Sequence, residues 1–339
     1  MSSNQAAWLD GKGAQLRVGE SSMPKAEAGK VVIRNKSVAI NPVDWKVQDY
    51  GVFVQSWPFV LGEDVAGEVV EVGEGVSHLK KGDRVAAHTV SLMSGKDEDG
   101  GFQLYSAAIA AKTVKLPDSV SFAQGSVIPL ALDTAAVGLY SKVADGFLGL
   151  PLPSLNPTSS GKTIVLWGGS TSVGCMAIQL AVASGAKVVA IASEHNHKLC
   201  KDLGASEVVD YKNKSVVDDV VAAVQKIGGD FVGVYDAISV QGDSYTHTVP
   251  ILEKLGGGSL ATVLPGPENP PSNVKAGNVF GINDLTHAIW AEYLPKGLES
   301  GKLKAVPEVL VIGTGLESVQ KGLNKNKEGV SAKKVVVEL

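Results

Sequence analysis

The chain has 339 residues, of which 44% are hydrophobic and 19% charged, and its formal net charge is −4. These values are ordinary for a globular protein with a sizeable core, and the length favours two domains. The slightly acidic balance, with lysines and arginines scattered along the chain, argues against a general nucleic-acid or anionic-membrane surface. The two cysteines are too few for a disulfide framework, so a reducing compartment is the simplest interpretation.

The two ends of the sequence carry no targeting signal. Residues 1–10 lack a basic region followed by an apolar run, and residues 335–339 carry no lipidation or retention motif. No apolar stretch approaches the roughly 18–20 residues needed to cross a bilayer. We therefore expect a cytoplasmic protein that binds neither membrane nor nucleic acid.

The first part of the chain, to about residue 125, has the pattern of short strands bounded by glycine. Residues 31–40 are rich in β-branched side chains, residues 68–72 alternate in polarity, and Gly82 opens another short strand. Strands at this spacing predict a β-rich barrel or sandwich. We assign this first domain to residues 1–125.

The pattern changes at Ser126. Residues 127–144 predict a helix, and three prolines within 149–157 predict a loop. From Lys162, strands alternate with helices; the strands are expected at 163–167, 187–192, 207–210 and 230–237, and the helices at 173–184, 197–203 and 216–226. This alternation predicts a parallel, doubly wound sheet in a second domain of residues 126–284. The strand at 333–337 needs a sheet to join, so about 285–339 should complete the first domain.

One segment carries the pattern of a dinucleotide site. An apolar strand at 163–167 leads into a glycine-rich turn, and a helix follows; the turn comprises Gly168, Gly169, Ser170, Thr171, Ser172, Val173 and Gly174. Small residues let backbone N–H groups approach a pyrophosphate, and the helix N-terminus adds partial positive charge. The strand–turn–helix context favours cofactor binding over a merely structural tight turn.

The end of the second strand bears on the choice of cofactor. An acidic side chain there accepts bonds from a ribose 2′-hydroxyl, whereas NADP needs neutral or basic groups for its 2′-phosphate. The strand is followed by Ser193, His195, Asn196 and Lys198, which suit a phosphate, although Glu194 has the wrong sign if it points inward. These residues favour NADP over NAD, unless the basic ones merely open a solvated helix.

Further motifs, together with the glycine-rich turn, indicate a protein family. They are Asn41-Pro42-Val43-Asp44-Trp45-Lys46, the run from Leu61 to Val69, Gly82-Asp83-Arg84-Val85, and Leu203-Gly204-Ala205 followed by Asp210-Tyr211. Together they resemble the medium-chain dehydrogenase/reductase superfamily over nearly the whole chain. Within it the sequence is similar to zinc-free quinone oxidoreductases and especially to fungal trans-acting enoyl reductases of the lovastatin type. The resemblance implies an α/β fold with a GroES-like β-rich domain, a Rossmann doubly wound parallel sheet, and an active site in the cleft between them.

The zinc-dependent members of that superfamily use a Cys, a Gly-His-Glu and a further Cys or His as catalytic ligands. Here the first position falls in residues 41–44 and the second reads Gly62-Glu63-Asp64, so thiolate and imidazole are both missing. The six histidines show no ligand spacing, and we expect no metal. Without a Lewis acid, alcohol oxidation loses its usual means of stabilising an alkoxide. Reduction of an activated C=C bond is the natural alternative.

The resemblance also implies roles for individual residues. Tyr50 matches the proton donor of related enoyl reductases, Lys46 a donor to a carbonyl or to the cofactor ribose, and Thr134 a residue beside nicotinamide and substrate. The remaining cofactor contacts are Val43, Asp44 and Trp45, Tyr211 near the 2′-phosphate, and Val263, Leu264, Phe280 and Gly281 on the nicotinamide side. Structural alternatives are a packed rim position for Tyr50 and bonds from Asp44 to its own loop.

Three hypotheses about function follow. The first is an NADPH-dependent enoyl or enone reductase in fungal secondary metabolism, acting on a small molecule or on a carrier-bound acyl chain of a polyketide synthase. The second is a zinc-free quinone or aldehyde reductase of free small molecules. The third is an NADPH-binding protein without turnover. Monomer and homodimer both remain open, with the monomer favoured.

Overall fold

The computed structural model describes residues 3–339, which divide into two compact units. One unit contains the chain up to Leu130 and again from Trp290, and the other contains residues 131–289. The first boundary lies at Leu130 rather than at 125 because this segment is tied to the first unit. The Leu130 N–H donates to Asp64 (2.7 Å), and the hydroxyls of Ser126 and Ser37 lie 3.2 Å apart.

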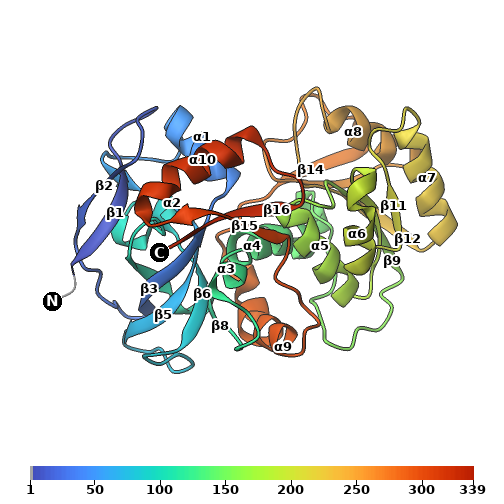
Figure 1. Ribbon diagram of the computed structural model, residues 1–339. Coiled ribbons are helices and arrows are strands. Elements are labelled where there is room, and N and C mark those ends of the chain that lie inside the picture. The colour runs from blue at the N-terminus through green and yellow to red at the C-terminus, as the bar shows by residue number, and fades with distance from the viewer. Residues whose placement is uncertain (1–2) are drawn as a thin grey trace. The chain divides into compact units, whose positions relative to one another are not determined.

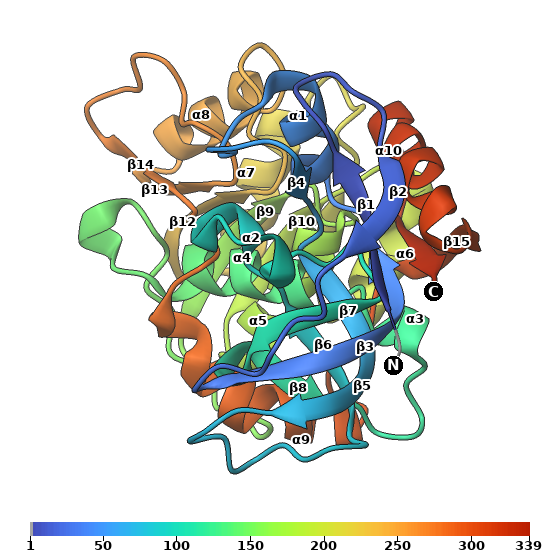
Figure 2. The same cartoon turned by 90° about the vertical axis from the view of Figure 1, so that its left-hand side faces the viewer.

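The first unit is built around two sheets. One has the order β2-β1-β4; the other has the order β15-β16-β3-β5-β6-β8, with β7 also pairing with β3. The strands are β1 Asn4–Leu9, β2 Arg17–Ser21, β3 Lys30–Ala39, β4 Phe59–Val60, β5 Asp64–Val72, β6 Arg84–His88, β7 Tyr105–Ile109, β8 Thr113–Lys115, β15 Glu308–Thr314 and β16 Lys333–Glu338. The helices are α1 Pro42–Tyr50, α2 Ser91–Ser94, α3 Phe122–Gly125, α9 Leu294–Glu299 and α10 Val319–Glu328. Figure 2 shows the larger sheet with β3, β5, β6 and β7 side by side.

The closing strand β16 joins the larger sheet of this unit (Figure 1). It pairs in parallel with β15 and antiparallel with β3, where Val337 faces Val38. Its three valines are fully buried, and Val335 and Val337 belong to the hydrophobic core of this unit. Burial of β-branched side chains is the main contribution such a strand makes to stability.

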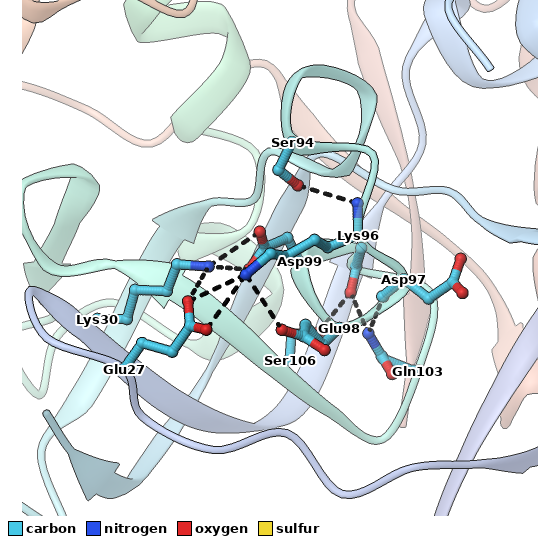
Figure 3. Close-up of polar contacts among 10 residues, drawn as sticks. Glu27, Lys30, Ser94, Lys96, Asp97, Glu98, Asp99, Gln103 and Ser106 are labelled. Atoms are coloured by element: carbon cyan, nitrogen blue, oxygen red, sulfur yellow. Dashed lines mark hydrogen bonds and ion pairs between the residues drawn. The ribbon is translucent and has the colours of Figure 1, made fainter. Parts of the chain in front are cut away.

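Polar contacts close the loop that contains Ser94 and Asp99 (Figure 3). The ammonium of Lys30 lies 2.7 Å from the buried carboxylate of Asp99, and Lys96 pairs with Glu27 at 3.2 Å. The Gln103 amide donates to the Asp97 carbonyl at 2.8 Å. Both cysteines of the chain are free and lie in the other unit, so this loop is held by ion pairs and hydrogen bonds.

The second unit confirms the predicted doubly wound parallel sheet. Its strand order is β11-β10-β9-β12-β13-β14, and every neighbouring pair is parallel. The strands are β9 Lys162–Trp167, β10 Lys187–Ile191, β11 Glu207–Val209, β12 Asp230–Asp236, β13 Gly258–Thr262 and β14 Val274–Asn278. The helices are α4 Pro129–Tyr140, which begins in the first unit, and α5 Ser172–Ala183, α6 His197–Asp202, α7 Val216–Ile227 and α8 Tyr245–Lys254.

Successive residues of the central strand β9 explain how both faces of this sheet are covered. Val165 and Trp167 belong to a core cluster with residues of α7 and α8. Ile164 and Leu166 point to the other face and are also fully buried. A strand buried on both faces reads as a continuous apolar run, which is what residues 163–167 show.

The sequence analysis found no apolar stretch long enough to cross a bilayer, but Phe122–Tyr140 is such a stretch. By length and composition it could cross a membrane, yet 78% of its apolar window is buried within the structure. It has the pattern of a core helix in which a turn at Ser126 separates α3 from α4. The predicted helix over 127–144 is shorter, since α4 ends at Tyr140.

A buried carboxylate joins four segments of the first unit. Asp64 at the start of β5 lies 3.0 Å from the ammonium of Lys334 in β16, and both side chains are buried. The same carboxylate accepts bonds from the Asn41 amide (2.8 Å) and from the Leu130 N–H (2.7 Å). Lys334 also donates to the side-chain amide oxygen Oδ1 of Asn41. Asp64 therefore connects β5, the start of α1, β16 and the start of α4.

Asp64→Asn should lower the free energy of unfolding by roughly 3–5 kcal/mol, because it leaves a buried ammonium without its counter-charge. Urea denaturation followed by circular dichroism measures this. The matched control is Asp202→Asn, which breaks the exposed Lys198–Asp202 pair and should cost less than about 1 kcal/mol. Equal losses in the two variants would contradict the role of Asp64.

Candidate cofactor-binding site

The glycine-rich turn follows β9 at the carboxyl edge of the sheet in the second unit. Its first residue, Gly168, has φ +79°, a conformation that glycine adopts without steric penalty. The N–H groups of Gly168 and Gly169 both donate to the Ile191 carbonyl, at 3.1 and 2.8 Å. The turn is thereby fixed to the end of β10.

Helix α5 begins at Ser172, within the glycine-rich turn, with Thr171 as its N-cap. The Thr171 hydroxyl accepts from the Gly174 N–H and donates to the Gly168 carbonyl, both at 2.9 Å. This hydroxyl therefore links the start of the helix to the first residue of the turn. Within residues 3–339, no hydrogen bond engages the N–H groups of Ser172 and Val173. These are the first N–H groups of a helix, which is where proteins bind phosphate.

Gly174 is required by a close approach of backbone to backbone. A Cβ atom at this position would lie 2.2 Å from the Gly168 carbonyl oxygen. Any side chain here would push the turn away from the helix start. The spacing of Gly168 and Gly174 therefore reflects geometry that a pyrophosphate cradle needs.

Two of the residues predicted to recognise a 2′-phosphate are brought to this turn. The Asn196 amide donates to the Ser170 hydroxyl at 3.1 Å and lies 3.5 Å from the Ser193 hydroxyl. Asn196 and Ser193 are both buried. Asn196 thus holds the end of β10 against the glycine-rich turn.

The charged residues of the same segment point elsewhere or are exposed. Glu194 and His195 are both exposed, and the Lys198 ammonium lies 2.6 Å from Asp202 on its own helix. The His197 ring nitrogen Nε2 lies 3.1 Å from the Ala192 carbonyl oxygen, which ties this ring to the backbone. Sequence reasoning left the direction of Glu194 open, and the structure places it in solvent.

Tyr211 follows the neighbouring strand β11. Ile191 faces Val209 in the parallel register, so Ser193 and Tyr211 both lie two residues beyond this pair at the carboxyl edge. Tyr211 is 44% exposed, and the Lys212 ammonium lies 5.9 Å from the centroid of its ring. Lys212 is a basic residue beside Tyr211 that the sequence interpretation did not include.

On the other side of β9, the structure brings two of the predicted nicotinamide residues together. A Cβ atom on Gly281 would lie 3.4 Å from the Thr134 hydroxyl oxygen, and the Tyr235 hydroxyl donates to the Thr134 carbonyl at 2.7 Å. Val263 and Leu264 follow β13 and are half-buried, whereas Phe280 is 56% exposed.

Two polar residues in this region were missed from the sequence. Asp236 ends β12, and its buried carboxylate accepts the N–H groups of Ile238 (2.9 Å) and Ser239 (2.8 Å). Ser239 in turn accepts the Val263 N–H at 2.9 Å. The signal that could have found them is their position just beyond the carboxyl end of an apolar strand.

In the first unit, the Asn-Pro motif forms the start of α1. The Asn41 N–H donates to Asp44 at 2.7 Å, which is one half of a capping box. Asp44 is fully buried, and burial raises the pKa of its carboxyl well above its usual range. Its carboxylate oxygen Oδ2 is thus used to hold its own loop, as the structural alternative had it.

The rest of α1 carries the aromatic and basic candidates. Val43 and Trp45 pack against the core of this unit. The ammonium groups of Lys46 and Lys327 lie 5.6 and 5.8 Å from the Trp45 ring, and partial burial lowers the pKa of Lys46. Tyr50 ends the helix and is 59% exposed, so its phenol is open to solvent within this unit.

The positions that bind zinc in other dehydrogenases hold different groups here. The Asn41 amide bonds to Asp64 and Lys334, so a buried ammonium already provides the cation beside Asp64. Glu63 is buried with its carboxylate 3.6 Å from His88, and burial raises the pKa of Glu63. Across residues 3–339, no group of three or more His, Cys, Asp or Glu side chains is placed to hold a metal ion. These residues do not fit a catalytic zinc.

Comparison with known proteins gives the family. Residues 27–118 match the family described as "Alcohol dehydrogenase GroES-like domain", and residues 172–276 match that described as "Zinc-binding dehydrogenase". The chain is 48% identical to the dehydrogenase orsE of Emericella nidulans, with both proteins covered completely. It is 41% identical to the trans-enoyl reductase himH of Aspergillus japonicus, over 99% of this chain and 97% of that protein.

Solved structures agree with the fold. An alcohol dehydrogenase superfamily protein from Novosphingobium aromaticivorans is similar with a TM-score of 0.76 and 23% identity, over 99% of both chains. The CurK enoyl reductase is similar with a TM-score of 0.72 and 19% identity, also over 99% of both chains. The GroES-like and Rossmann-type units, the glycine-rich turn and the full-length relatives lead to one conclusion: the chain belongs to the medium-chain dehydrogenase/reductase superfamily and is an oxidoreductase of a family that uses a nicotinamide cofactor.

Proposed function

We propose that the protein is an NADPH-dependent reductase of an activated C=C bond in an enoyl or enone acceptor. The observation that carries this proposal is similarity over the whole chain to fungal proteins named trans-enoyl reductases, at 41% identity in Aspergillus japonicus and 34% in Aspergillus flavipes. The glycine-rich turn supports it, because the N–H groups of Ser172 and Val173 lie at a helix start without acceptors among the described residues.

Different residues of the second unit would bind different parts of the cofactor. The turn would bind the pyrophosphate, and Ser193, Tyr211 and Lys212 would lie beside the 2′-phosphate at the edges of β10 and β11. Thr134 and Gly281 would line the nicotinamide side. When bound, a reduced nicotinamide supplies a hydride.

The residues of α1 would serve the acceptor. The hydride adds to the β-carbon of the C=C bond, and the electron pair moves toward the carbonyl oxygen to give an enolate. Lys46 would stabilise that oxygen by donating a hydrogen bond, and the Tyr50 hydroxyl would deliver the proton to the α-carbon. Half-burial of Lys46 favours this role, because a partly desolvated ammonium interacts more strongly with a developing negative charge.

We also propose that turnover needs no zinc. A dication beside Asp64 would compete with the buried ammonium of Lys334, and Asn41 offers an amide where the zinc enzymes offer a thiolate. The proposed acceptor is an acyl thioester or enone of secondary metabolism, presented free or on the carrier domain of a polyketide synthase.

Gly174→Ala should lower kcat/KM for the cofactor on the order of 10²-fold, because its Cβ atom displaces the Gly168 carbonyl and opens the turn. This is expected although alanine has the higher helix propensity. Steady-state kinetics over a range of NADPH concentrations measure the change. The control is Gly11→Ala, whose Cβ atom meets nothing within 4 Å. A Gly174→Ala enzyme with unchanged cofactor kinetics would refute this placement.

The wild-type enzyme should prefer NADPH to NADH in kcat/KM. Lys212→Ala should reduce kcat/KM for NADPH roughly tenfold and leave that for NADH unchanged, because only the 2′-phosphate loses a charged hydrogen bond. Lys214→Ala, which removes another exposed lysine three residues beyond Tyr211, is the control. A clear preference of the wild type for NADH would argue against the proposed cofactor.

Assays of an enoyl thioester, a free enone, a quinone and an aldehyde should show the highest kcat/KM for the thioester or the enone. Tyr50→Phe should reduce kcat by about 10²–10⁴-fold on that acceptor, as expected for loss of a proton donor. Adding a chelator should leave the rate unchanged. Highest activity on the quinone or aldehyde would favour the second function, and NADPH binding without any turnover would favour the third.

A further inference from the structure

The loop after β12 contains a residue in an unusual backbone conformation. Ser239 has φ +55°, in the left-handed region that favours glycine, and the residue is only 3% exposed. A buried serine persists in such a conformation only where its surroundings hold it there. Its contacts identify what holds it.

Ser239 joins the ends of two parallel strands. Its hydroxyl donates to the Asp236 carbonyl at the end of β12 (2.6 Å) and accepts the Val263 N–H just after β13 (2.9 Å). Glycine would fit the backbone without strain but has no hydroxyl to form this bridge. The side chain is therefore retained against a backbone preference for glycine.

The same loop is anchored by Asp236 and touches the glycine-rich turn. The Asp236 carboxylate accepts the N–H groups of Ile238 and Ser239 and the Thr248 hydroxyl (3.2 Å). A Cβ atom on Gly168 would lie 3.0 Å from the Ile238 side chain. The loop thus spans from the phosphate turn to the end of β13.

The strand order identifies which half of a cofactor this loop serves. Strands β10 and β11, with Ser193 and Tyr211 beyond their ends, lie on one side of β9, whereas β12 and β13 lie on the other. A dinucleotide that lies across the carboxyl edge, with its pyrophosphate at the turn after β9, extends its two halves in opposite directions. The Ser239 bridge is on the side away from the proposed 2′-phosphate site.

We propose that Ser239 is a positioning residue for the nicotinamide half of the cofactor, acting by fixing the backbone of Val263 and Ile238. The inference rests on the proposed function, because it assumes that a dinucleotide binds at the turn. Ser239 does not contact the reacting atoms in this scheme. It sets the surface against which the nicotinamide lies.

The experiment compares two ligands on the Ser239→Gly variant. NADPH occupies both halves of the site, and 2′-phosphoadenosine diphosphoribose lacks only the nicotinamide. Calorimetric titration should show an NADPH Kd raised about five-fold, as expected for loss of one hydrogen bond, with the Kd of the fragment unchanged. The midpoint of thermal unfolding of Ser239→Gly should fall no further than that of the control variant Leu252→Ala, because glycine removes the backbone strain.

The control variant is Leu252→Ala, which removes a fully buried side chain of α8 from the core of the same unit. It should lower the midpoint of thermal unfolding and leave the ratio of the two Kd values at the wild-type value. The inference is overturned if Ser239→Gly binds NADPH as the wild type does, or if it weakens both ligands equally. Failure of the wild type to bind either ligand would instead overturn the proposed cofactor itself.

Discussion

The constraint on which the candidate site depends is the parallel sheet of the second unit. Parallel strands end at one edge, so residues that follow β10, β9, β12 and β13 are brought together, although Ser193 and Val263 are 70 positions apart in the sequence. At that edge the N–H groups of Gly168 and Gly169 bond to Ile191, which fixes the turn to β10. The turn, the Ser193–Asn196 contact and the Ser239 bridge are all consequences of this shared edge.

In the first unit, a buried ion pair lies where zinc-dependent dehydrogenases of the superfamily bind a metal. Asp64 and Lys334 neutralise each other, and the Asn41 amide and the Leu130 N–H satisfy the remaining carboxylate lone pairs. An ion pair of this kind is stable only when every polar partner is in place. It connects segments from both ends of the chain.

Much of the fold could be predicted because its signals are local. The apolar run at 163–167, the glycines that follow it and the alternation of strand and helix lie within short windows, and short-range periodicity reports secondary structure directly. Thr171 shows the limit of such reasoning. Its hydroxyl bonds to Gly174 and Gly168 because Thr171 is the N-cap of α5, and the residue at which this helix starts is not fixed by the glycine pattern alone.

The sequence by itself determined the family, the parallel sheet and the location of the glycine-rich turn, because each is marked by consecutive residues. Only the tertiary structure decided what individual polar side chains do. Asp44 caps its own helix, Lys198 pairs with Asp202, and Ser239 bridges two strands. Hydrogen bonds and ion pairs act over about 3 Å between residues that can be distant in the chain, so their partners are set by packing and are not visible in the order of residues.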